Sequence, residues 1–328
     1  MQENKESKIR ESQAELNLKN LQAKEPNIKS PRVDDNEKLF DNEFLKKIER
    51  ISINSRIIIP DGATGNRKSK SKGSSVEFSD YREYAEADDF RRIDWNAYGR
   101  FERLFIKLFM EEREAMVHIF LDTSKSMDFG NPKKSFASRR LAAAIGYLCF
   151  ANYDSVSVYC INENIDAMRL NLRGKNNFPA FLKTLESVEY RGETNLYSSV
   201  LQANIQDRRG ISIIISDLFS NNARSRNSGY FDDMLKYLKF KKQDVYVCQV
   251  LSPAEIEPDL DENCRLVDSE TSEFLDVTIS SSLIRTYKDA FRRFVERIEN
   301  DCFKRGARYM LMNTSVPVEQ AVKTMASG

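Results

Sequence analysis

The chain has 328 residues, of which 41% are hydrophobic and 31% charged, and its formal net charge is +1. This length predicts one large domain with extensions or two modest domains, and the balanced charge excludes a general attraction to nucleic acid or anionic membranes. No run approaches the roughly 20 apolar residues of a membrane helix, and the polar residues 1–20 lack the apolar core of a signal peptide.

The chain contains five cysteines with no paired spacing and a single histidine, His118. An odd, unclustered set of cysteines indicates reduced thiols and a cytoplasmic protein. Most histidine-based catalysis and zinc binding are excluded, and the apolar neighbours of His118 favour a structural role over a catalytic one.

The N-terminal part divides into three segments. Residues 1–36 are polar and are expected to be disordered or weakly helical. Apolar residues at helical spacing predict an amphipathic helix over residues 35–53, followed by a short strand at 56–59. The loop 61–75 carries basic residues at 67–72, which are typical of a solvated hairpin loop; the alternative is a contact for an acidic or phosphorylated partner, or for nucleic acid.

The stretch Val76 to Arg100 mixes acidic, basic and aromatic residues too densely for simple periodicity. We expect a buried polar connector anchored by Trp95, in which three arginines form ion pairs with nearby carboxylates. The arginines are Arg82, Arg91 and Arg92, and the carboxylates are Glu77, Asp88, Asp89 or Asp94. The alternative is a recognition surface, or a site that abuts the metal. We expect this connector, the preceding helix and the short strands with the basic loop to form one segment, residues 37–112.

From Leu104 onwards apolar strands alternate with helices, and residues 113–328 are expected to form one α/β domain. Near-continuous Val/Ile runs separated by helices predict a Rossmann-like, doubly wound and mostly parallel sheet covered on both faces. A C-terminal hairpin, a long helix over 280–305 and a last strand and helix follow. We expect strands at 104–110, 115–122, 156–161, 168–172, 211–217, 245–251 and 309–312, and helices at 135–152 (capped by Ser135), 177–188, 196–206, 231–240 and 318–325.

A candidate metal site begins where the buried strand at 115–122 ends. Asp122, Ser124 and Ser126 form D-x-S-x-S in the following loop. Ligands of this fold class gather at the carboxyl ends of strands, and oxygen-only donors suit Mg²⁺. The pattern alone is weak, so further ligands from other loops are needed.

Two later loops offer such ligands. Thr194, in G-E-T-N, would add a third hydroxyl, although its simpler role is to cap the next helix. Asp217 ends the most apolar strand, I-S-I-I-I-S-D, where carboxylates of this class often face the ligand crevice. Two carboxylates and three hydroxyls suit a metal ion that keeps waters in its other positions.

These motifs resemble a known family. D-T-S-K-S with Thr194 and Asp217 is similar to the metal-ion-dependent adhesion site of von Willebrand factor A (vWA) domains. E-F-S-D-Y-R-E-Y ahead of D-D-F-R-R-I-D-W resembles the hallmark of a bacterial branch of that superfamily, domain of unknown function 58 (DUF58).

The resemblance implies bound Mg²⁺, with Mn²⁺ as a substitute. Ser124, Ser126 and Thr194 would touch the metal, while Asp122 and Asp217 would act mostly through waters. An open metal position would accept an acidic residue of a partner, and MoxR-type AAA+ ATPases commonly accompany such proteins. Many members carry N-terminal membrane helices, whereas none is expected here.

We therefore expect a non-enzymatic, Mg²⁺-dependent protein-binding module that serves as an adaptor for such an ATPase. The site has hydroxyls but no credible general base, and no phosphate loop occurs in the chain. The alternative is a Mg²⁺-dependent phosphoryl-transfer or hydrolytic enzyme in which Asp122 or Asp217 organises the metal.

Overall fold

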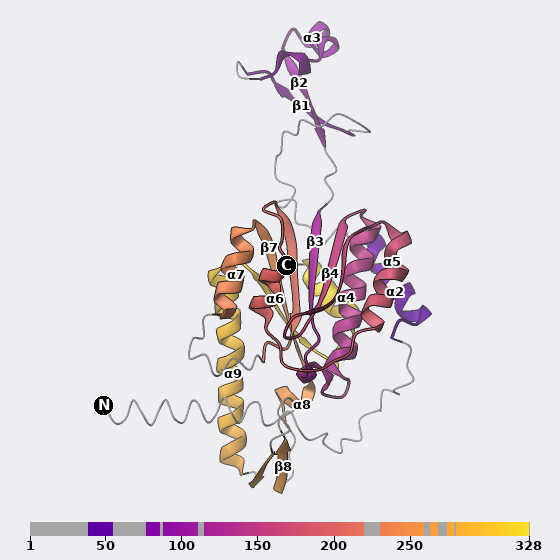
Figure 1. Cartoon of the computed structure of the whole chain (residues 1–328). Coiled ribbons are helices and arrows are strands. Elements are labelled where there is room, and N and C mark those ends of the chain that lie inside the picture. Colours follow the sequence, from indigo (N-terminus) through magenta and orange to yellow (C-terminus); the bar gives the residue numbers. More distant parts are fainter. Residues whose placement is uncertain are drawn as a thin grey trace, which may run out of the picture. The chain divides into compact units, whose positions relative to one another are not determined.

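The computed structural model describes residues 39–54, 77–85, 88–110, 115–219, 230–258, 263–267, 274–278 and 280–327. The chain forms two compact units, one of residues 64–114 and one of residues 1–63 with 115–328 (Figure 1). The expected N-terminal extension 1–36, the strand at 56–59 and the basic loop at 67–72 lie outside the described residues.

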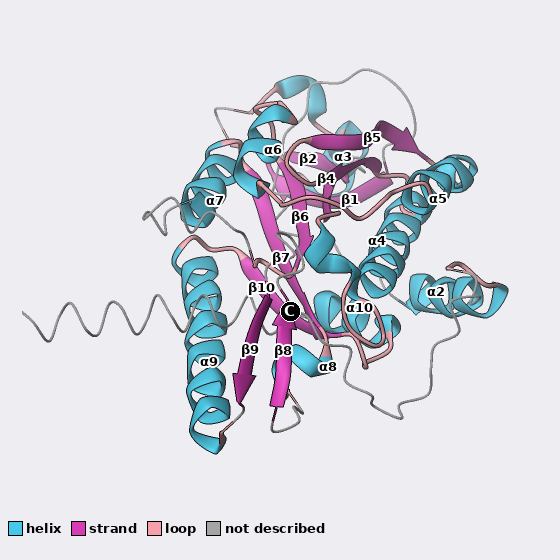
Figure 2. Ribbon diagram, turned by 60° about the horizontal axis from the view of Figure 1, so that its bottom comes forward, coloured by secondary structure: helices cyan, strands magenta, loops and turns pink. Residues whose placement is uncertain are grey.

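The larger unit is built on a six-stranded sheet in the order β10-β7-β6-β3-β4-β5 (Figure 2). All neighbouring strands run parallel except β4 and β5, which are antiparallel. The chain order reverses between β3 and β6, and ligands of doubly wound sheets bind at such a switch point. The strands are β3 (Met116–Asp122), β4 (Ser155–Ile161), β5 (Ile165–Arg173), β6 (Gly210–Ser216), β7 (Gln243–Leu251) and β10 (Arg308–Asn313).

Helices cover both faces of this sheet, as Figure 1 shows for the helices on either side of β3. One face packs against α4 (Lys134–Ala151), α5 (Phe178–Glu186) and α10 (Val318–Ser327). The other packs against α6 (Leu196–Gln202), α7 (Tyr230–Phe240) and α9 (Ser281–Lys304). The predicted fold class, an α/β doubly wound and mostly parallel sheet, is confirmed.

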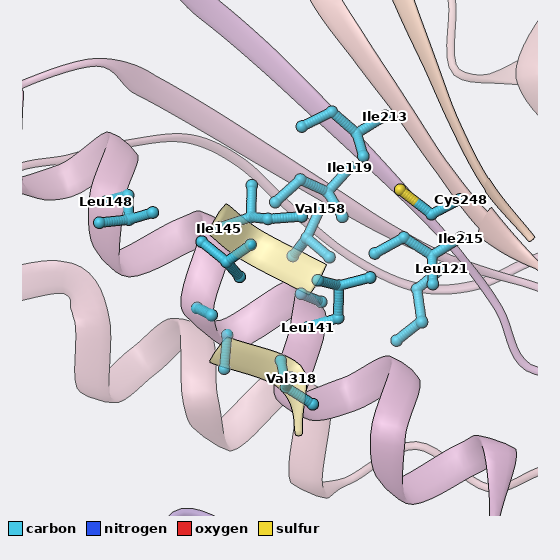
Figure 3. Close-up of a cluster of buried hydrophobic side chains, with 14 of the residues drawn as sticks. Ile119, Leu121, Leu141, Ile145, Leu148, Val158, Ile213, Ile215, Cys248 and Val318 are labelled. Atoms are coloured by element: carbon cyan, nitrogen blue, oxygen red, sulfur yellow. The ribbon is translucent and has the colours of Figure 1, made fainter. Parts of the chain in front are cut away.

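Strand periodicity sorts the core into these two layers. On β3, Ile119 and Leu121 point to the α4 face, whereas Phe120 points to the α6–α7 face. Figure 3 shows Ile119 and Leu121 facing Leu141 and Ile145 of α4. All seven residues of β3 are buried, which anchors the strand that ends at Asp122.

The helix α2 (Asn42–Asn54) packs on α4 within the larger unit. Arg140 of α4 donates to the Asp41 carboxylate at 2.8 Å, and its guanidinium stacks over the Phe44 ring. The predicted grouping of residues 37–112 into one segment therefore differs from the structure, because α2 buries its apolar face on α4 rather than joining residues 64–114.

The smaller unit pairs β1 (Glu77–Glu83) with β2 (Phe105–Met110) in antiparallel fashion around η2 (Phe90–Arg92) and α3 (Trp95–Phe101). The expected ion pair between Arg82 and Asp88 is present, with Nη2 2.6 Å from Oδ1. The expectation that Trp95 is an anchor is wrong, because its side chain is 65% exposed. The alternative role as a recognition surface stays a hypothesis.

After β7 come the short helix α8 (Pro253–Ile256) and the predicted hairpin, β8 (Asn263–Val267) with β9 (Phe274–Thr278). The Ser280 side chain caps α9, which confirms the long C-terminal helix. Within the described ranges, no helix is both long and apolar enough to span a membrane.

Candidate metal centre

Asp122 is the last residue of β3 and is fully buried. Its Oδ1 accepts the backbone N–H of Ser124 at 2.9 Å, and its Oδ2 accepts the Ser216 hydroxyl at 2.5 Å. One donor comes from its own loop and the other from the end of β6, so the carboxylate is oriented by both strands at the switch point.

Ser124 occupies the N-cap position of the 3₁₀ turn η3 (Lys125–Asp128), and Ser126 lies within this turn; both are buried. Their hydroxyl oxygens lie 3.1 Å apart. Paired hydroxyls at this spacing present two neutral oxygen donors to one point, as a small hard cation requires.

Thr194 lies on the loop before α6, and backbone hydrogen bonds tie this loop to the first one. The N–H of Lys125 donates to the Gly192 carbonyl at 3.0 Å, and the N–H of Arg191 donates to the Thr123 carbonyl at 3.1 Å. The two loops therefore lie side by side, as the sequence predicted for the candidate site.

The simpler role for Thr194, a helix cap, is wrong. Asn195 caps α6, since its side chain accepts the N–H of Ser198 at 3.1 Å. Thr194 is only 4% exposed, and its Oγ1 has no hydrogen-bond partner among the described residues. A buried hydroxyl without a partner costs about 1–3 kcal/mol, so a ligand that engages it offsets a real penalty.

Asp217 directly follows β6 and is fully buried. Its Oδ1 accepts the N–H of Phe219 at 3.0 Å, and its Oδ2 lies 2.7 Å from Nζ of Lys134. The same ammonium lies 2.6 Å from Oε1 of Glu255 on α8. The sequence therefore located the carboxylate correctly but missed its partners.

Lys134, Glu255 and Ser216 are the polar residues that sequence reasoning missed. Lys134 is the first residue of α4, where Ser135 had been expected as the cap; the cap position is instead Lys133, and the Ser135 hydroxyl donates to Asp128. A lysine just before an Ala-rich helix carries no signal of burial, and Glu255 is 121 residues away in the chain.

Burial dominates the electrostatics of the site. Burial, together with the charge of Asp217, raises the pKa of Asp122 to about 6. Burial alone would lower the pKa of Lys134, but Asp217 and Glu255 together raise it, so its amine is held as an ammonium. Burial also raises the pKa of Glu255 against the opposing effect of Lys134.

The donor set fits a hard divalent cation. Among the described residues no group of three His, Cys, Asp or Glu side chains is placed to hold a metal ion, so zinc-type or carboxylate-rich sites are not formed there. Two oriented carboxylates and three hydroxyls, one of them unpartnered, instead match the oxygen chemistry of Mg²⁺ or Mn²⁺. The residues that would hold the ion are Asp122, Ser124, Ser126, Thr194 and Asp217.

His118 lies within β3, four residues before Asp122, and is 5% exposed. Its Nδ1 is 3.4 Å from the Tyr159 hydroxyl, and burial with the nearby Arg208 charge lowers its pKa to about 4. A ring held neutral inside the sheet fits the structural role that the sequence favoured.

Three comparisons place the chain among known proteins. Uncharacterized proteins of Mycobacterium tuberculosis (Rv1480) and Mycobacterium bovis (Mb1516) are each 26% identical over 152 residues, which cover 44% of this chain and 48% of theirs. The chain thus matches about half the length of these curated relatives.

Among solved structures, BatB from Bacteroides thetaiotaomicron is 15% identical with a TM-score of 0.37, over 65% of this chain and 100% of that one. The SpRpn10 VWA domain is 11% identical with a TM-score of 0.38, over 66% and 98%. The model for "Protein of unknown function DUF58" matches residues 80–297. This match confirms the expected family, and the chain belongs to the DUF58 proteins.

Proposed function

We propose that this protein is a non-enzymatic, Mg²⁺-dependent protein-binding module. The chain belongs to the DUF58 proteins, and the vWA domains that its motifs resemble commonly mediate protein interactions. The ion would be held by Ser124, Ser126 and Thr194 and, through waters, by Asp122 and Asp217. It would supply a Lewis-acidic position for a carboxylate of the partner.

The observation that carries the proposal is the buried Oγ1 of Thr194, which has no hydrogen-bond partner in the described part of the chain. It belongs to a loop that is hydrogen-bonded to the loop of Ser124 and Ser126. Fully buried polar groups are nearly always satisfied, so an orphan hydroxyl beside two others and two oriented carboxylates supports a missing ligand.

Binding rather than turnover is supported by the absence of a histidine base from these five residues. The chain has one histidine, and it is buried within β3. Both carboxylates are engaged by fixed donors, which suits a role in orienting water around an ion. A MoxR-type AAA+ ATPase in the cytoplasm is the partner that the family resemblance favours. Four of the five cysteines, Cys149, Cys160, Cys248 and Cys302, are buried and free in the described part of the chain, which fits a reducing compartment.

The test is affinity capture with purified MoxR-type ATPase, in Mg²⁺ and in EDTA. Wild-type protein should retain the ATPase only in Mg²⁺, and Asp122→Asn and Asp217→Asn should abolish retention while keeping the circular dichroism spectrum. Thr314→Val serves as a control outside the site. Capture that survives both Asn variants contradicts the proposal, and phosphatase or nuclease turnover that Asp122→Asn abolishes would establish the enzymatic alternative.

A further inference from the structure

Lys134 forms a buried charge cluster with Asp217 and Glu255. Its side chain is fully buried, and Nζ lies 2.7 Å from Asp217 and 2.6 Å from Glu255. The ammonium also lies 5.5 Å from the centre of the Phe219 ring. A lysine is almost never buried so deeply unless carboxylates pair with it.

The rest of the fold holds this lysine in place. Both Glu255 oxygens are engaged, since Oε2 accepts the N–H of Ser252 at 2.7 Å and its hydroxyl at 2.9 Å. The Tyr287 hydroxyl of α9 donates to the Glu255 carbonyl at 2.5 Å. Gly130, with φ +94°, lets the loop before α4 approach Ser252, where a Cβ would come within 2.4 Å of the serine Cβ. Lys134 is thus fixed from α4, α8 and α9.

This geometry bears directly on the two candidate carboxylate ligands. Asp122 and Asp217 are both fully buried at the ends of adjacent strands, so their negative charges repel at low dielectric. A cation beside one of them relieves that repulsion. Lys134 supplies such a cation permanently, and it uses the Oδ2 side of Asp217 while the backbone uses Oδ1.

We propose that Lys134 is a built-in counter-cation of the metal site, which competes with the divalent ion for Asp217 and allows the metal-free domain to keep its fold. This inference rests on the proposed function, since it concerns the regulation of the same site. This competition makes metal binding weak and reversible, and the partner and the ion together overcome the hold of Lys134 on Asp217. Glu255 acts as the positioning residue that keeps the ammonium against Asp217.

The experiment compares wild-type protein with the double variant Lys134→Met/Glu255→Gln, which removes the charges of Lys134 and Glu255 and leaves Asp217 as the one carboxylate of the cluster, free of its competing ammonium. Isothermal titration with Mg²⁺ alone, and with Mn²⁺ alone, should show binding about tenfold tighter in the double variant. In EDTA the double variant should unfold at a lower temperature than wild type, and saturating Mg²⁺ should raise that temperature by more than it does for wild type.

Lys134→Gln is the second variant, because a neutral amide still donates to both carboxylates; it should shift affinity in the same direction by less. Lys133→Gln is the matched control, since that neighbouring lysine is 44% exposed and pairs with Asp128. It should leave metal affinity unchanged. A purely structural role for Lys134 would lower stability without tightening metal binding.

The outcomes separate this inference from the proposed function. If wild type binds Mg²⁺ and the Lys134 variants bind it equally or more weakly, the counter-cation role is wrong and the metal site stands. If the variants alone bind, Lys134 outcompetes the ion, as proposed. If neither binds at millimolar Mg²⁺, the metal-dependent function itself is wrong, and the inference falls with it.

Discussion

Thr194→Val removes one hydroxyl and keeps the size and branching of the side chain. Because Oγ1 of Thr194 is buried and no described residue hydrogen-bonds to it, the wild-type hydroxyl costs stability in the metal-free protein. Its removal should raise the free energy of unfolding in EDTA by about 1 kcal/mol. For a unit of this size, that corresponds to a rise of about 2–4 °C in Tm.

Saturating Mg²⁺ should reverse the order of the two proteins. An ion that binds only the folded state at one hundred times its Kd stabilises wild type by about 2.7 kcal/mol. Thr194→Val should lose most of this gain, because it lacks one of three hydroxyl donors. The variant should therefore melt above wild type in EDTA and below it in Mg²⁺.

Thermal unfolding monitored by circular dichroism, in EDTA and over a series of Mg²⁺ concentrations, measures both effects. The matched control is Thr314→Val, because the Thr314 hydroxyl is also buried and has no partner within the described ranges, but it lies outside the candidate site. This control should gain stability in both conditions and keep the full response to Mg²⁺. A Thr194→Val protein that loses stability in EDTA, or that keeps the wild-type response to Mg²⁺, refutes the reasoning.

Three further predictions concern stability. The folded-state pKa of His118 is lowered from 6.5 to about 4, so the stability gained from its neutral ring is complete above pH 6.5 and is lost as pH falls through 4. Between pH 7.5 and 5, the free energy of unfolding should drop by about 2 kcal/mol more in wild type than in His118→Phe. Urea titration measures this difference. Asp232→Asn should lower the free energy of unfolding by about 1 kcal/mol at pH 7, because the bidentate ion pair of Asp232 with Arg305 joins α7 to α9. Arg305 and Lys236 together lower the pKa of Asp232 to about 2, so the loss of stability should vanish near pH 2. An equal loss at pH 2 would contradict the ion-pair explanation. Gly146→Ala should destabilise the protein by about 1–2 kcal/mol despite the better helix propensity of alanine, because the new Cβ would lie 2.6 Å from the buried Phe181 ring. A gain of stability in chemical denaturation would show that the Phe181 ring moves to accommodate the methyl group.

The fold class followed from local patterns. Ile-rich strands such as β6 are buried along their whole length, and only a sheet covered by helices on both sides buries such strands completely. The predicted strand and helix positions from Leu104 onwards agree with the structure to within a few residues at most ends. Patterns failed in the smaller unit, where charged and aromatic residues alternate without a buried face, so β1 and the exposure of Trp95 were missed.

Part of the candidate site could likewise be predicted from the strand patterns. Asp122 and Asp217 each end a strand, and parallel strands bring their carboxyl ends to one edge of the sheet, so chain order alone brought them together. The local sequence could not decide whether Thr194 is a metal ligand or the cap of α6. Only the tertiary structure showed that Asn195 caps α6 and that the Thr194 hydroxyl is left over.

The sequence by itself therefore determined the doubly wound sheet and the strand ends that carry Asp122 and Asp217, because hydrophobic periodicity is a property of the local sequence. The tertiary structure decided the environment of those carboxylates. Lys134 and Glu255 come from α4 and from α8, far apart in the chain, and the burial that turns them into a charge cluster exists only after the helices have packed.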